Sequence, residues 1–107
     1  MKYLLSLHYS IREGTLDVES KAVATACYSL GLTQLSQLRM ARGFNFEFEK
    51  VDDESAVLLA KEIVAAFPKT PSGYNEILHD LECVLRCNGE VIWQEHINKP
   101  LAQFIKV

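Results

Sequence analysis

The side chains that could do chemistry in this chain of 107 residues are few: three histidines, three cysteines and one pair of closely spaced carboxylates. His8, His79 and His96 are far apart in sequence. Imidazole is a common metal ligand, so three histidines on converging strands could form a metal site. They fall on different predicted strands, however, and we interpret them as solvated or hydrogen-bonded strand residues.

The cysteines do not form a recognisable pair. Cys27 falls within a helical pattern, whereas Cys83 and Cys87 fall in a segment that we interpret as a strand. Four residues of strand separate two Cα atoms by about 13 Å, which is too far for a disulfide or a shared metal ion. On a helix the same spacing could chelate a metal, but no second ligand pair stands nearby. We predict buried, reduced thiols.

Glu47 and Glu49 would lie on one strand face, about 6.6 Å apart, a separation at which carboxylates can do acid–base work. On an exposed strand we interpret them as a solvated face. The sequence has no Gly-rich phosphate loop, no H-E-x-x-H, no paired C-x-x-C and no G-x-S-x-G. We therefore predict no catalytic, cofactor-binding or metal-binding residues.

Composition narrows the class of protein. Hydrophobic residues make up 49% of the chain, charged residues 23%, and the net charge is −3. These values are ordinary for one globular domain spanning residues 1–107, and they give no electrostatic footprint for nucleic acid. No stretch approaches the roughly 18 apolar residues of a membrane span. The polar interruptions in residues 1–14 do not suit a signal peptide, so we expect a cytoplasmic protein.

The first elements are a strand and a helix. Residues Lys2–Ile11 alternate with the two-residue period of a half-buried strand. Asp17 is a suitable N-cap for a helix that ends at Gly31. Val23, Ala26, Cys27 and Leu30 form an apolar stripe on that helix, and we expect it to pack on the sheet.

The middle of the chain predicts two further strands. Leu35–Arg42 is an irregular strand with Leu38 and Met40 as its apolar pair, and Gly43 marks a turn. The next seven residues, FNFEFEK, alternate clearly, with Phe44, Phe46 and Phe48 on one face. Three aromatic residues on one face could stack on bases, but the acidic opposite face argues against this, and we interpret them as core.

A second helix and a hairpin follow. Asp52 or Asp53 caps a helix that Pro68 ends. The segment Ile77–Leu81 suits either a helix or the start of a strand, and we prefer a strand that continues to Cys87. Asn88-Gly89 then predicts a type I′ hairpin and a returning strand over Glu90–Ile97. We assign no form to Leu101–Val107.

The predicted fold class is α+β. The predicted order is a ferredoxin-like β-α-β-β-α-β sandwich, with two helices on one face of an antiparallel sheet, plus an added C-terminal hairpin strand. The other sheet face, with Leu4 and Val84, is only partly polar. We expect a second subunit to cover it, and therefore a homo-oligomer.

Residues 12–49 resemble the PurS family, the small subunit of phosphoribosylformylglycinamidine synthase, and the resemblance extends over roughly Lys2–Leu85. Gly14, Leu16, Asp17, Ala22 and Val23 match its first block, Leu30-Gly31 its helix end, and Leu38, Arg39 and Arg42 its turn block. ILHDLECV is similar to the last strand of the family. The chain departs from the family at Val18-Glu19-Ser20 and at Ala41, and residues 88–107 form an extension without a counterpart.

The resemblance implies a non-catalytic subunit that self-associates and bridges a large synthetase subunit and a glutaminase subunit in purine biosynthesis. ATP and glutamine would be used by those partners, so this chain would need no cofactor and would have no catalytic site of its own. Arg39 and Arg42 are the candidate partner contacts. The alternative is an ACT-like regulatory domain that senses a small molecule. A small metal protein or enzyme using the histidines and cysteines is a third reading.

Overall fold

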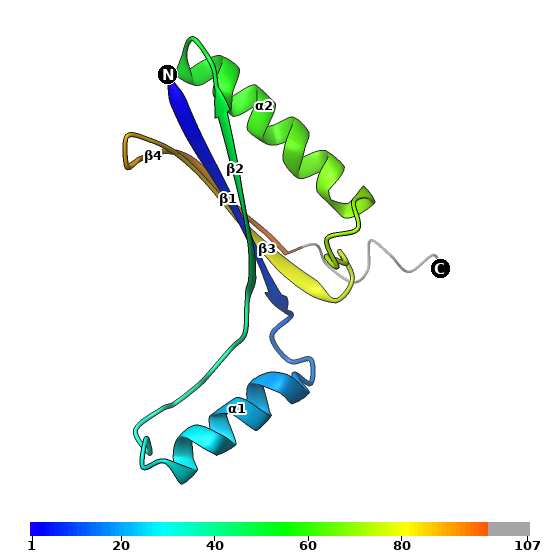
Figure 1. Ribbon diagram of the computed structural model, residues 1–107. Coiled ribbons are helices and arrows are strands. Elements are labelled where there is room, and N and C mark those ends of the chain that lie inside the picture. The colour runs from blue at the N-terminus through cyan, green and yellow to red at the C-terminus, as the bar shows by residue number, and fades with distance from the viewer. Residues whose placement is uncertain (99–107) are drawn as a thin grey trace, which may run out of the picture.

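The computed structural model describes residues 1–98, so the tail Leu101–Val107 lies outside the described residues. Its elements, in chain order, are β1 (Lys2–Ile11), α1 (Val18–Ser29), β2 (Arg42–Glu49), α2 (Asp53–Ala66), the short 3-10 helix η1 (Phe67–Lys69), β3 (His79–Cys87) and β4 (Glu90–Ile97). Figure 1 shows these elements. No helix among them is long and apolar enough to span a membrane.

The strands form one antiparallel sheet in the order β2-β1-β3-β4. α2 lies along one face of this sheet (Figure 1). Two helices with a four-stranded antiparallel sheet confirm the predicted α+β, ferredoxin-like fold class.

The strand predicted over Leu35–Arg42 is wrong. Residues 35–41 are irregular, and β2 begins only at Arg42 and continues through Gly43. Gly43 is not a turn residue: it pairs with His8 of β1, and a Cβ atom there would lie 2.6 Å from the His8 ring. The order is therefore β-α-β-α-β-β, and the hairpin strand predicted as an addition is the fourth strand of the sheet.

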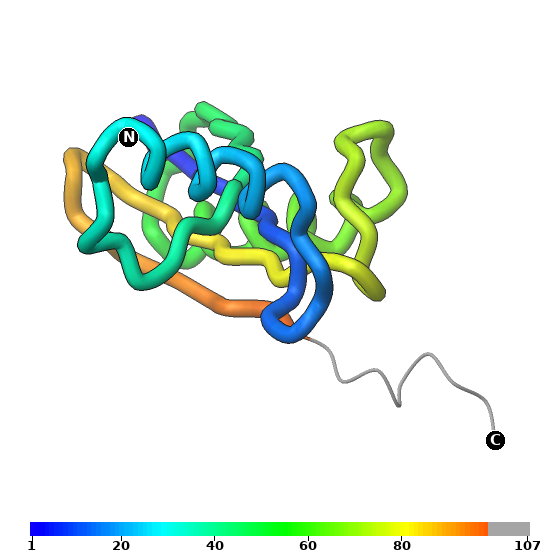
Figure 2. Tube along the Cα trace, turned by 90° about the horizontal axis from the view of Figure 1, so that it is seen from below, coloured from blue at the N-terminus to red at the C-terminus, as the bar shows by residue number. Residues whose placement is uncertain are grey.

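This difference moves α1 away from the sheet. A helix between two parallel strands must cross back over the sheet, but β1 and β2 are antiparallel neighbours, and their connection does not have to. α1 lies beyond the end of the sheet (Figure 1), and in the view from below in Figure 2 it lies in front of the strands. The expectation that its stripe packs on the sheet is wrong: Val23 is 44% exposed and Leu30 81% exposed.

Several local predictions are confirmed. Asp17 caps α1 by accepting from the Ser20 N–H at 3.0 Å, and Asp52 caps α2 through the Ser55 N–H at 2.8 Å. Hydrogen bonds from these serines hold the pKa of both carboxyl groups below the usual value. Asp53 has another partner, because it accepts from the Tyr3 hydroxyl at 2.8 Å.

The last two strands form the expected hairpin. Asn88 and Gly89 both have positive φ, 52° and 82°, as a type I′ turn requires. β3 begins at His79, so the helical alternative for Ile77–Leu81 is wrong. Ile77 belongs instead to a turn, in which its N–H donates to the Asn75 side chain at 2.8 Å.

The core lies between the sheet and α2. The buried residues are contributed by alternate positions of β1 and β3, by two alanines of α2, by η1 and by the following loop: Tyr3, Leu5, Leu7, Tyr9, Leu81, Cys83, Leu85, Ala56, Ala60, Phe67 and Tyr74. Phe44, Phe46 and Phe48 pack against this cluster from the edge strand β2 and remain partly exposed, which confirms their predicted core role.

Three core groups keep their protons more tightly than in an unfolded chain. Burial, with the hydrogen bond to Asp53, raises the pKa of Tyr3 from 10.0 to about 12. Burial also raises the pKa of Tyr74 from 10.0 to about 12 and that of Cys83 from 9.0 to about 12.

We expect the free energy of unfolding to fall as pH rises above about 9. The unfolded chain then loses these protons while the folded chain retains them, so the stability present below pH 9 is lost progressively towards pH 12. Urea unfolding at pH 7.5, 9.5 and 10.5 measures the decline. Tyr74→Phe, which removes one of the groups, should make the decline smaller. A decline in Tyr74→Phe equal to that of the unmodified protein would contradict this explanation.

Gly73 is a position at which we expect a side chain to destabilise the fold. Its φ is +88°, and a Cβ atom there would lie 2.7 Å from the hydroxyl oxygen of the buried Tyr9, which donates to the Ser72 carbonyl at 2.8 Å. We expect Gly73→Ala to cost about 1–2 kcal/mol for the backbone and about 1–3 kcal/mol more for displacing Tyr9, measured by chemical denaturation.

Gly14→Ala is the matched control for Gly73→Ala. Gly14 has a similar φ of +83°, but nothing lies within 4 Å of its added Cβ atom. It should lose only the backbone contribution. Equal losses in the two variants would show that the contact with Tyr9 has no energetic effect.

Candidate functional site

The described residues bring together no group of three or more His, Cys, Asp or Glu side chains suited to a metal ion. His8 and His96 do share the sheet face opposite α2. They lie in one cross-strand row with Glu82 between them, since His8 pairs with Glu82 and Glu82 pairs with His96. All three side chains are exposed.

His79 belongs to the other face and has a structural environment. Its ring packs 4.6 Å from the Tyr9 ring and 6.1 Å from the Tyr74 ring, measured between centroids. Its Nδ1 accepts from the Asn75 N–H at 2.9 Å. Burial lowers the pKa of His79, although the Asn75 hydrogen bond opposes this. The sheet therefore separates His79 from His8 and His96.

The three cysteines are free thiols. Cys83 is fully buried beneath α2, and its raised pKa keeps it protonated at neutral pH, so it is not a nucleophile there. Cys87 is half-buried four positions along the same strand, and Cys27 is half-buried on α1.

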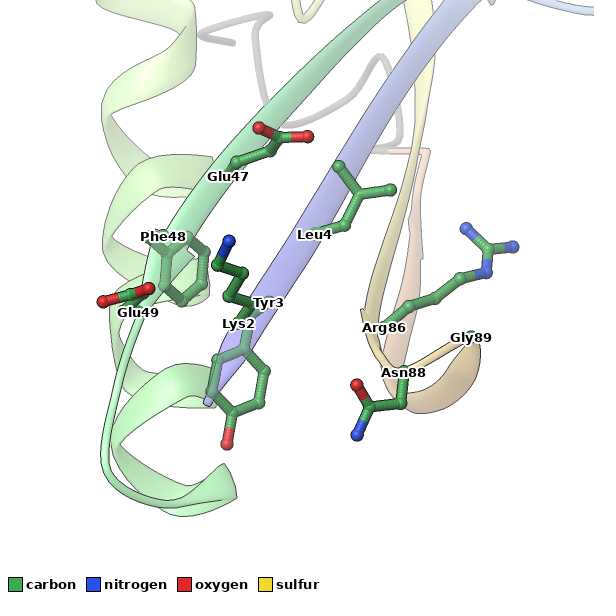
Figure 3. Close-up of a pocket in the computed structure, with 9 residues that line it drawn as sticks. All are labelled: Lys2, Tyr3, Leu4, Glu47, Phe48, Glu49, Arg86, Asn88 and Gly89. Atoms are coloured by element: carbon green, nitrogen blue, oxygen red, sulfur yellow. The ribbon is translucent and has the colours of Figure 1, made fainter.

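The predicted carboxylate pair lines a hollow on the sheet face opposite α2. This hollow, of about 480 Å³, lies over the start of β1, between the end of β2 and the Asn88-Gly89 turn. Figure 3 shows Leu4 between Glu47 of β2 and Arg86 of β3. Glu49 pairs with Lys2 in the strand register.

The hollow has mixed chemistry and a wide mouth. Basic Arg86 lies on the other side of the apolar Leu4 from acidic Glu47 (Figure 3), and basic Lys2 lies beside acidic Glu49, its partner in the strand register. Tyr3 also borders the hollow, but its hydroxyl is engaged with Asp53 at the start of α2. Such a surface suits contact with the polar surface of another protein better than proton transfer on a small substrate.

A second exposed surface belongs to residues 12–41, which we call the arm. It comprises α1 and its two connections to the sheet. Within residues 1–98, fourteen large hydrophobic residues are exposed, and eight of them belong to the arm: Leu16, Val18, Val23, Tyr28, Leu30, Leu32, Leu35 and Met40. An apolar surface of this kind is typical of a contact with another protein.

The predicted contact residues Arg39 and Arg42 lie where the arm joins the sheet, at the start of β2. Arg39 lies 3.9 Å from Asp80 of β3 and donates to the Ile11 carbonyl. Arg42 begins β2, with its guanidinium 6.0 Å from the centre of the Phe44 ring. Arg42 also lines a hollow of about 570 Å³ with Leu16, Val18 and Met40 of the arm.

Sequence reasoning missed the arm because the α1 stripe was read as a core face. One signal was available: the stripe has only two large aliphatic residues, Val23 and Leu30. The second helix and the residue after it have four large apolar residues at helical spacing: Leu59, Ile63, Val64 and Phe67. A helix with so little apolar surface is weak evidence for packing on a sheet.

Comparison with known proteins gives the family. The family model PurS, described as phosphoribosylformylglycinamidine (FGAM) synthase, matches residues 6–67, which include the whole arm. No curated protein matches the chain. The fold is similar to the crystal structure of Methanocaldococcus jannaschii PurS, one of the subunits of formylglycinamide ribonucleotide amidotransferase in the purine biosynthetic pathway. The TM-score is 0.60 at 19% identity, covering 78% of this chain and 95% of that one. Because the family model covers more than half of its length, this chain belongs to the PurS family of FGAM synthase.

Proposed function

We propose that this chain is a non-catalytic assembly subunit of the FGAM synthase complex in purine biosynthesis. In that complex a large synthetase subunit uses ATP, a glutaminase subunit supplies ammonia, and formylglycinamide ribonucleotide becomes the amidine. This chain bridges the two larger subunits and helps ammonia pass between them. It acts in the cytoplasm and holds no cofactor of its own.

The observation that carries the proposal is the PurS match over residues 6–67. The matched segment includes the exposed apolar arm, and the described residues offer this surface without such a group of His, Cys, Asp or Glu side chains as a metal ion needs. A chain with exposed contact surfaces and no such cluster is suited to organising the subunits that do carry out the reaction.

Self-association is part of the same proposal. No described residue covers the sheet face opposite α2 in the way that α2 covers the core face (Figure 1). That face carries Leu4 and the half-buried Val84 among polar neighbours, and the arm adds a larger apolar surface. A homo-oligomer would bury part of both surfaces.

Reconstitution tests the assembly role. Tagged chain added to a cell extract should recover the synthetase and glutaminase subunits together. Amidine formation from glutamine by the two purified larger subunits should rise at least about tenfold when this chain is added, because positioned subunits raise the effective concentration of ammonia. Capture of neither subunit, or full glutamine-dependent activity without the chain, would refute the proposal.

The absence of a catalytic role has its own test. His8→Ala, His96→Ala and Cys87→Ala remove side chains that are exposed or half-buried on the sheet. Each variant should support reconstituted activity within about twofold of the unmodified chain, since no step passes through these groups. Loss of more than about a hundredfold in a variant that still assembles would assign that side chain to catalysis.

A further inference from the structure

We infer that residues 99–107, which we call the last segment, bind in a hollow between the second half of α2 and the end of β4. The inference goes beyond the proposed function and does not depend on it, because the contact lies within one chain.

The hollow opens onto the edge of the core. It has a volume of about 340 Å³, and the residues that line it include Tyr74 and Leu81, which are 7% and 1% exposed. Val64, Pro68 and Ile97 also line it and are only half-buried. Covering such partly exposed apolar groups with further apolar side chains is favourable, so the hollow suits an apolar occupant.

The last segment begins at this hollow. The described part of the chain ends at Asn98, directly after β4, and Ile97 at the end of β4 lines the hollow itself. Phe104 follows Asn98 by six residues, and six extended residues span about 20 Å, which is long compared with a hollow of this volume.

The covalent connection favours this segment over a separate protein as the occupant. A segment tethered by a short linker has an effective concentration in the millimolar range at its site. A partner chain at a lower concentration would have to bind the hollow more tightly than the last segment does in order to displace it.

The composition of the last segment complements the hollow. Two acidic residues and one basic residue line the hollow, Glu76, Glu95 and Lys61, so its formal charge is −1. The side chains of the last segment have a formal charge of +2, because it contains two lysines and no acidic residue. Charges of opposite sign favour the contact. Four of its nine residues are large and apolar: Leu101, Phe104, Ile105 and Val107.

Glu95 is the acidic residue whose position most needs a basic partner. It pairs with the buried Cys83, so it lies on the sheet face that α2 covers, and its side chain is exposed there. Glu95 forms no ion pair within residues 1–98. Lys99 or Lys106 of the last segment would supply one.

The hollow also involves residues outside the segment that the family model matches. That model ends at residue 67, whereas Pro68, Tyr74, Glu95 and Ile97 come later in the chain. The contact therefore depends on residues that the family match does not cover.

Protection of the Phe104–Ile105 bond tests the contact. Chymotrypsin cleaves after aromatic residues, and mass spectrometry of the full chain gives the rate of cleavage at this bond. The rate for a synthetic peptide of residues 97–107, divided by the rate for the full chain, gives a protection factor. We expect a factor of at least about ten, because cleavage requires the segment to leave the hollow.

Two variants on α2 provide a matched pair. Ala65 and Ala66 are neighbouring exposed residues, and Ala65 lines the hollow whereas Ala66 does not. Ala65→Lys places a long basic side chain against a basic segment and should reduce the protection factor at least about fivefold. Ala66→Lys should leave the factor within about twofold of the unmodified chain.

Charge reversal at β4 tests the electrostatic part. Glu95→Lys should reduce the protection factor at least about threefold, since it replaces an attraction by a repulsion. Changing Lys99 and Lys106 to Glu in the same chain should restore the protection, measured against a peptide that carries the same two changes.

Three outcomes with the unmodified chain and the α2 variants would each overturn the inference: a protection factor near one in the unmodified chain, an unchanged factor in Ala65→Lys, or an equal loss in Ala66→Lys. Circular dichroism should give the same folded spectrum for these variants and for Glu95→Lys, because all three positions are exposed. A protection factor that rises with protein concentration from about 1 to 100 μM would assign the contact to a second copy and would also overturn the inference.

Discussion

The pairing of β1 with β2 decides where the rest of this chain can lie. The two strands are antiparallel neighbours over a continuous register from Lys2↔Glu49 to Tyr9↔Arg42. The arm joins the C-terminal end of β1 to the N-terminal end of β2, and these two ends lie at the same end of the sheet. An antiparallel pair therefore needs no crossover connection. By contrast, β2 and β3 both run antiparallel to β1 and are parallel to each other, so α2 must travel the length of the sheet between them. This connectivity places α2 on the core face, whereas α1 does not have to pack on the sheet.

The core that results is one helix and one sheet thick. Small residues, Ala56 and Ala60, bring α2 close to β1 and β3, and Phe67 closes the end of the layer against Phe44 and Phe46. Tyr3 and Tyr9 contribute at both ends of β1, since each combines a buried ring with a hydroxyl that ties the strand to α2 or to the Ser72 loop. The same burial raises the pKa of Cys83 and lowers the pKa of His79, so it favours the uncharged form of each group.

The parts of the fold that follow from local rules could be predicted from sequence. The alternation of Lys2–Ile11 and of Phe44, Phe46 and Phe48 fixed both strands and their buried faces, and Asn88-Gly89 fixed the hairpin. The wrong predictions concern features that depend on tertiary contacts and not on the local sequence pattern. Gly43 reads as a turn in sequence, yet it is required within a strand because the His8 ring occupies the place of a side chain. The stripe of α1 shows that the helix has an apolar side, but periodicity alone does not identify the surface that covers it.

The candidate site was harder to predict than the fold for the same reason. The sequence search was built around groups that react, and it did not consider that a helix could be held out from the sheet. The residues that do this are ordinary by type: a serine in the first turn of α1 and two arginines near the strand ends. On the proposed function their importance is geometric, because a surface that is already held in place loses less conformational freedom on binding than a flexible one. A partner that covers the arm would also stabilise the folded chain by mass action, so folding and assembly of this subunit would be thermodynamically linked.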